Sequence, residues 1–152
     1  MPGNADKEAM KMGSKQPQTE ELMNLEKSIK ILETPFNEAC RLLGLEKTKP
    51  CEFLEVENCI FFFDPAQDYV FSSAVIMGGK YGFYGIKIGA NWLETAGQLE
   101  LQGFKQASDL ERFTKPGQEF NISVYLYPDD SPDTSTSKVK DYSVCARYGQ
   151  AL

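Results

Sequence analysis

The amino-acid sequence predicts an α+β domain made of two tandem α-β-β-β repeats, with an antiparallel sheet and the helices packed on one of its faces. A short helical pattern followed by three strand-like stretches occurs twice along the chain. Ile86-Lys87-Ile88 repeats Ile29-Lys30-Ile31, 57 residues further on. The 152 residues, of which 41% are hydrophobic, suit a single globular domain with a sizeable core.

The first residues and the residues that follow them differ in character. Residues 1–18 are polar and lack periodicity, so we expect a disordered N-terminal arm. The domain then covers residues 19–152, with the repeats over about 19–79 and 80–148. Four apolar residues near its start have helical spacing, although the Ile-Lys-Ile alternation is equally compatible with a short extended segment. These four residues are Leu22, Leu25, Ile29 and Leu32.

The first helix is predicted to begin at Thr34-Pro35 and to end at Gly44. Threonine can accept a hydrogen bond from a free N–H group, and proline at the first helical position loses no intrahelical bond. Glycine readily adopts the left-handed conformation that ends many helices. An apolar stripe lies between these two signals. It consists of Phe36, Ala39, Cys40 and Leu43.

Three strands are predicted after this helix, over residues 51–56, 59–64 and 69–77, with a two-residue turn at 57–58. In this hairpin Cys59 lies opposite Val56, whereas Cys51 lies near the far end of the pair. A disulfide between the two cysteines contradicts that arrangement, because their Cα atoms would be too far apart. We therefore expect buried free thiols and no metal site.

The second unit repeats the pattern with a clearer helix start. Asn91 and Glu94 form a capping box, and Gly103 ends the helix. Strand-like stretches follow over residues 108–114, 120–127 and 138–148.

The lead-in Gly85-Ile86-Lys87-Ile88-Gly89, before a capped helix that ends Leu101-Gln102-Gly103, resembles the β-lactamase-inhibitor-protein-like fold. The resemblance covers roughly residues 20–148. In the first copy Ser28 and Leu32 stand where the second has Gly85 and Gly89. Proteins of this fold join tandem units edge to edge and occur as secreted inhibitors and as small lipoproteins of bacterial envelopes. The resemblance thus implies a binding or assembly module without catalysis.

Composition argues against several classes of function. The chain has no histidine, which excludes Ser-His-Asp and Cys-His catalysis and histidine-ligated metals. Its net charge is −6, so nucleic acid is an unexpected partner. No apolar run approaches the ~20 residues of a membrane-spanning helix. We predict no catalytic residues, no cofactor and no metal, and rank a carboxylate-dependent enzyme last.

The predicted protein-binding site lies on the outer face of the last strands. Residues 120–127 alternate between apolar and polar, which places Tyr125 and Tyr127 on the face opposite the core, beside Arg147. Tyrosine and arginine are typical of protein contact surfaces, although a solvated strand face needs no partner. Asp129 and Asp130 belong to a long polar loop that could also contact a partner. That loop lacks the glycine and closing glutamate of an EF-hand, so we do not expect calcium.

The leading hypothesis is a non-catalytic protein-binding module, inhibitor-like or envelope-associated, whose partner and oligomeric state the sequence leaves open. The alternative is a cytoplasmic small-ligand-binding or accessory domain, with an apolar cavity between helices and sheet. The residues proposed to line that cavity are Phe61, Phe63, Phe71 and Trp92. We expect an extracytoplasmic or envelope-anchored protein if a leader preceded Met1, and otherwise a cytoplasmic one.

Overall fold

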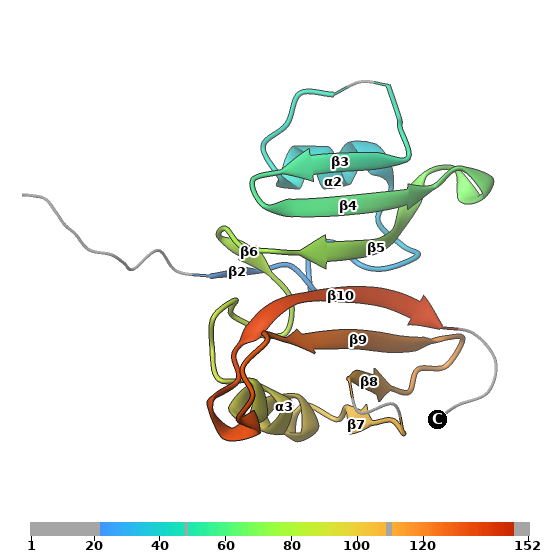
Figure 1. Cartoon of the computed structure of the whole chain (residues 1–152). Coiled ribbons are helices and arrows are strands. Elements are labelled where there is room, and N and C mark those ends of the chain that lie inside the picture. Colours follow the sequence, from blue (N-terminus) through green and yellow to red (C-terminus); the bar gives the residue numbers. More distant parts are fainter. Residues whose placement is uncertain (1–21, 48, 109–110, 148–152) are drawn as a thin grey trace, which may run out of the picture.

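The computed structural model describes residues 22–47, 49–108 and 111–147. Within these ranges the chain forms two α-helices and a seven-stranded antiparallel sheet of order β3-β4-β5-β10-β9-β8-β7 (Figure 1). The predicted α+β class and antiparallel sheet are confirmed. The arm predicted over residues 1–18 lies outside the described residues.

The first half of the fold contains α2 and three consecutive antiparallel strands. Before them, β2 (Met23–Asn24) pairs in parallel with the short strand β6 (Tyr81–Gly82). A 3-10 turn, η2 (Pro65–Gln67), connects two of the strands. The elements are α2 (Phe36–Leu42), β3 (Phe53–Val56), β4 (Cys59–Asp64) and β5 (Val70–Ile76).

The hairpin formed by β3 and β4 has the predicted register. Val56 pairs with Cys59, and Glu57 in the two-residue turn has a left-handed φ of 55°. All four cysteines are free thiols, as expected, but only Cys40 and Cys59 are buried, whereas Cys51 and Cys145 are half-buried.

The start of the first helix differs from the prediction. Pro35, not Thr34, is the residue that precedes α2, and it makes no side-chain cap. The Thr34 hydroxyl instead accepts a hydrogen bond from the Lys30 N–H at 2.8 Å, which closes the preceding turn. Residues 26–29 and 31–34 each form a turn that ends in a bend, so neither the expected helix nor an extended segment at Ile29–Ile31 is present. The predicted stop is confirmed, because Gly44 has a φ of 75°.

The second half contains α3 and the remaining strands of the sheet. The Asn91 side chain accepts a hydrogen bond from the Glu94 N–H at 2.9 Å, as predicted, and Gly103 has a φ of 99°. The two-residue strand β7 was not predicted. The elements are α3 (Trp92–Leu101), β7 (Lys105–Gln106), β8 (Arg112–Lys115), β9 (Asn121–Pro128), η3 (Thr134–Thr136) and β10 (Val139–Arg147).

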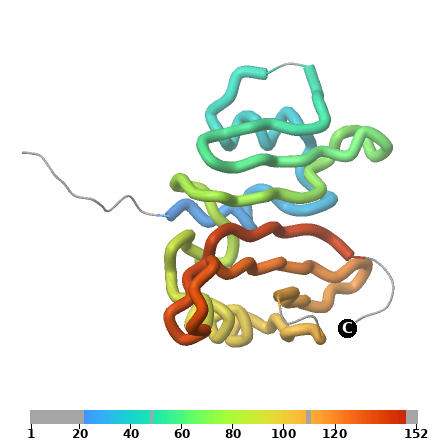
Figure 2. The backbone as a smooth tube through the Cα atoms, in the orientation of Figure 1, coloured from blue at the N-terminus to red at the C-terminus, as the bar shows by residue number. Residues whose placement is uncertain are grey.

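The last strands of the two halves, β5 and β10, pair with each other and make one continuous sheet (Figure 2). Tyr142 lies opposite Ile76, and Val144 lies opposite Ala74. Directly opposed residues share a face of the sheet. Because these four side chains are almost completely buried, the core lies on this face.

Aromatic rings link the helices to that core. The Phe36 ring of α2 contacts Phe63 edge-on, with centroids 4.9 Å apart. The Trp92 ring of α3 lies 6.0 Å from Phe113, and its indole N–H donates to the Leu126 carbonyl at 2.8 Å. Burial of these apolar surfaces supplies the main favourable free energy of folding.

Tyr142 ties the middle of the sheet to the connection between the halves. Its side chain is fully buried, and its hydroxyl accepts a hydrogen bond from the Phe83 N–H at 2.8 Å. Burial raises the pKa of this hydroxyl, so it stays neutral. Gly82 lies so close that a Cβ there would approach the Tyr142 oxygen to 3.1 Å.

We expect Tyr142→Phe to lower the free energy of unfolding by about 1–3 kcal/mol, because the buried Phe83 N–H would lose its acceptor. Urea unfolding followed by circular dichroism measures this loss. Tyr69→Phe is the matched control, since its half-buried side chain makes no such contact, and we expect a change within ~0.5 kcal/mol. Equal effects of the two substitutions would contradict the assignment.

Candidate functional site

Three of the five predicted binding residues lie together on the face of the sheet opposite the core, which we call the outer face. The Arg147 guanidinium donates a hydrogen bond to the Tyr125 hydroxyl at 2.8 Å. The Tyr125 ring stacks on Tyr127, with centroids 6.4 Å apart and an angle of 20° between the rings. Tyr127 is 37% exposed. Arg112 of β8 lies opposite Tyr125 on the same face. We call Tyr125, Tyr127 and Arg147 the tyrosine–arginine cluster.

The alternation predicted for β9 holds at one end of the strand and fails at the other. Val124 and Leu126 are fully buried in the core, as expected. Ser123, expected to face water, is also fully buried, and its hydroxyl lies 3.1 Å from that of Thr114. Asn121 is 9% exposed and accepts a hydrogen bond from the Gly117 N–H. The prediction of a solvated face is therefore wrong for these two residues, whose polar groups tolerate burial because Thr114 of β8 and the Gly117 N–H provide hydrogen-bond partners.

The outer face of β3, β4 and β5 carries apolar side chains that the predicted site did not include. Phe53 is 55% exposed, and its ring lies 6.5 Å from that of Phe62. Ile60 and Val75 lie opposite each other on the same face and are half-buried. The run Phe61-Phe62-Phe63 was the available signal, since consecutive aromatic residues in a strand must point to both faces.

The two predicted aspartates do not belong to the tyrosine–arginine cluster. Asp129 accepts hydrogen bonds from the Ser131 N–H and the Ser137 hydroxyl, both at 3.1 Å, and the first of these is the main reason its pKa is lowered. It lines a hollow of about 380 Å³ beside Trp92 at the start of α3. Asp130 is exposed. Among the described residues, no group of histidine, cysteine or carboxylate side chains could hold a metal ion.

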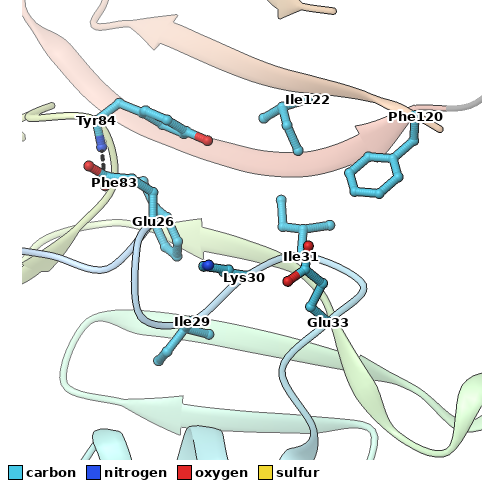
Figure 3. Close-up of a pocket in the computed structure, with 9 residues that line it drawn as sticks. All are labelled: Glu26, Ile29, Lys30, Ile31, Glu33, Phe83, Tyr84, Phe120 and Ile122. Atoms are coloured by element: carbon cyan, nitrogen blue, oxygen red, sulfur yellow. Dashed lines mark hydrogen bonds between the residues drawn. The ribbon is translucent and has the colours of Figure 1, made fainter. Parts of the chain in front are cut away.

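The phenylalanines proposed to line a cavity are packed together instead. Phe61 and Phe71 are fully buried, Phe63 is 2% exposed, and their ring centroids lie 6.1 Å apart in the pairs Phe61–Phe71 and Phe63–Phe71. A different cavity, of about 210 Å³, lies between the turn segment 26–33 and the start of β9 (Figure 3). Phe120 and Ile122, predicted as core, are half-buried because they line this cavity.

Burial makes three of the thiols poor nucleophiles. It raises the pKa of Cys59 to about 11, and the nearby Glu57 adds to that shift. Burial also raises the pKa of Cys40 and of Cys145, the latter on the outer face. Because the thiolate is the reactive form, a raised pKa leaves these thiols protonated and weakly reactive, even where Lys47 and Arg147 partly oppose the shift at Cys40 and Cys145.

Comparison of the chain with protein-family models, with curated proteins and with solved structures finds no match. In the part of the chain that the structure describes, the longest helix has ten residues, and none combines the length and apolarity needed to cross a membrane.

Two substitutions test whether the buried polar contact of the outer face contributes more to stability than the partly exposed one. Thr114→Val should lower the free energy of unfolding by about 1–3 kcal/mol, because the fully buried Ser123 hydroxyl would lose its partner. Tyr125→Phe removes a partly exposed hydrogen bond and should cost less than ~1 kcal/mol. Chemical denaturation of the two variants beside the wild type measures both values. A larger loss for Tyr125→Phe would show that the cluster serves folding.

Proposed function

We propose that this chain is a non-catalytic protein-binding module, inhibitor-like or envelope-associated, whose outer sheet face recognises another protein. The observation that carries the proposal is the tyrosine–arginine cluster, in which stacked rings and a hydrogen-bonded guanidinium stand on a rigid sheet. Such side chains provide a large contact area and lose little conformational freedom on binding, because they are already held in place.

The rest of the outer face supports an extended contact surface. Phe53 and Phe62 add apolar area at one end, and Arg112 adds a second guanidinium beside Tyr125. Aromatic residues and arginine are enriched in protein interfaces relative to other surfaces. The guanidinium of Arg147, half-exposed, would pair with carboxylate or carbonyl groups of the partner.

The proposal includes the tandem-repeat interpretation, with both helices on the core face of the sheet. Leu32 and Gly89, 57 residues apart, both have left-handed φ values, of 64° and 90°. Their N–H groups donate to the carbonyls of Phe71 at 2.7 Å and Val139 at 2.8 Å, at the starts of β5 and β10. The residues before the two helices also make antiparallel bridges, Pro35 to Val70, the first residue of β5, and Asn91 to Lys138, the residue before β10. These equivalences support duplication of one unit.

Equivalent residues of the two helices are 56 positions apart in the sequence, whereas equivalent residues of the turns before them are 57 positions apart. Phe36 and Trp92 then correspond, and both are the first residue of their helix and pack against the core. The proposed kinship with the β-lactamase-inhibitor-protein-like fold rests on this unit and on the edge-to-edge pairing of β5 with β10. Proteins of that fold are binding or assembly modules, which agrees with the proposed role of the outer face.

The chemistry of the chain also favours binding over catalysis. The sequence has no histidine, and the pKa of three cysteines is raised by burial. The remaining acids and bases would be carboxylates, lysines and tyrosines. We therefore propose that the protein is not an enzyme and acts through its surface.

A photo-crosslinking amino acid at position 127, expressed in the organism that makes the protein, should capture the partner. The same group at position 101, where Leu101 of α3 is 82% exposed, is the matched control and should not capture it. With the purified partner, the Tyr125→Ala and Tyr127→Ala double variant should bind at least ~10-fold more weakly while its circular dichroism stays native. Equal binding by the double variant and the wild type would contradict the proposal.

A further inference from the structure

The cavity in Figure 3 has an apolar end and a polar end. Ile31, Phe120 and Ile122 line the apolar end, and Lys30 and Tyr84 line the polar end. The Tyr84 ring reaches over the gap with its hydroxyl turned inward, and the Lys30 side chain lies across the gap from it (Figure 3).

Tyr84 occupies its place through a strained backbone. Its φ is 59°, in the left-handed region that a bulky side chain rarely adopts. Three contacts hold it there. Its N–H donates to the Glu26 carboxylate at 2.8 Å, its carbonyl accepts from the Gln102 side chain at 3.0 Å, and its ring packs edge-on against Phe104 at 5.0 Å. Strained backbone conformations that are fixed by surrounding contacts are common at ligand-binding sites, where they hold a side chain in position.

The Tyr84 hydroxyl is a hydrogen-bond donor without an acceptor among the described residues. Burial, helped by Glu26, raises the pKa of Tyr84 to about 12, so the hydroxyl keeps its proton at neutral pH. A half-buried donor that faces a cavity requires either water or a ligand as its acceptor.

The charges around the cavity indicate which acceptor fits. The Glu26 carboxylate, which also lines the cavity, accepts a hydrogen bond from the Tyr84 N–H (Figure 3). The Lys30 ammonium and the Tyr84 hydroxyl face the polar end as donors, whereas the carboxylate of the exposed Glu33 lies beside Ile31 at the other end of the cavity (Figure 3). Two donors of which one is cationic match an anionic oxygen group.

We propose that this cavity binds a small carboxylate with an apolar body. Lys30 and Tyr84 hold the carboxylate, and Ile31, Phe120 and Ile122 contact the hydrocarbon. An apolar cavity of about 150 Å³ can hold benzene. A volume of about 210 Å³ therefore suits one ring or branched chain with a single carboxylate.

This site is separate from the proposed protein-binding surface. Ile122 and Tyr125 are three residues apart in β9, so their side chains point to opposite faces of the sheet. Loss of partner binding by the tyrosine variants and loss of ligand binding at the cavity are therefore distinguishable results.

Titration of the full chain with benzoate by isothermal calorimetry tests the proposal, with benzylamine as the cationic comparison. We expect saturable binding of benzoate and weaker binding of benzylamine. Lys30→Met and Tyr84→Phe should each weaken benzoate binding by about 5-fold or more, since each removes a donor to the carboxylate. Glu33→Gln should strengthen it by about 2-fold, because a like charge is removed.

Lys27→Met is the matched control. Lys27 is an exposed lysine on the same turn segment and does not line the cavity, so we expect benzoate affinity to change by less than ~2-fold. Circular dichroism of each variant verifies the fold. The proposal is overturned if benzoate fails to saturate up to its solubility limit, if benzylamine binds more tightly, or if Lys27→Met weakens binding as much as Lys30→Met.

Discussion

The antiparallel pairing of β5 with β10 is the constraint on which the rest of the structure depends. It joins strands whose residues are about 70 positions apart, such as Ile76 with Tyr142, into one sheet. The core side of this pairing is closely packed, because the small Ala74 lies between the larger Phe61 and Val144. Without it the three-stranded piece β3-β4-β5 and the four-stranded piece β10-β9-β8-β7 would each expose a further edge, and the outer face would not be continuous.

Local signals predicted the elements well, and non-local contacts account for the failures. The turn at Glu57 sets the register of the β3–β4 hairpin, and the Asn91 cap depends on residues three positions apart, so both could be read from short stretches. The Thr34 hydroxyl was expected to cap the helix, but it accepts a hydrogen bond from the Lys30 N–H instead, and a capping rule does not consider residues that precede the helix. Ser123 tolerates burial because the hydroxyl of Thr114, on another strand, is its hydrogen-bond partner.

The same distinction applies to the candidate sites. The period-two pattern of β9 was enough to put Tyr125 and Tyr127 on one face, and the β9–β10 pairing then brought Arg147 to them. The cavity could not be predicted in this way, because Lys30 and Tyr84 are far apart in the chain and their proximity depends on the folded turn segments. Tyr84 and the following Gly85 both have left-handed φ values. The sequence suggests this conformation only for the glycine, so the strained backbone of Tyr84 could not be predicted.

The wall of the cavity and the outer face share one mechanical support. Phe83, the residue before Tyr84, donates its N–H to the buried hydroxyl of Tyr142 in β10, and β10 also carries Arg147. The backbone of Tyr142 is paired with both β5 and β9, and that of Arg147 is paired with β9, so neither backbone can shift without disturbing hydrogen bonds of the sheet. Ile122 of the cavity and Tyr125 of the cluster point to opposite faces of β9, so a ligand in the cavity does not contact the cluster. Occupation of the cavity should thus leave the geometry of the tyrosine–arginine cluster unchanged, and the two surfaces should act independently.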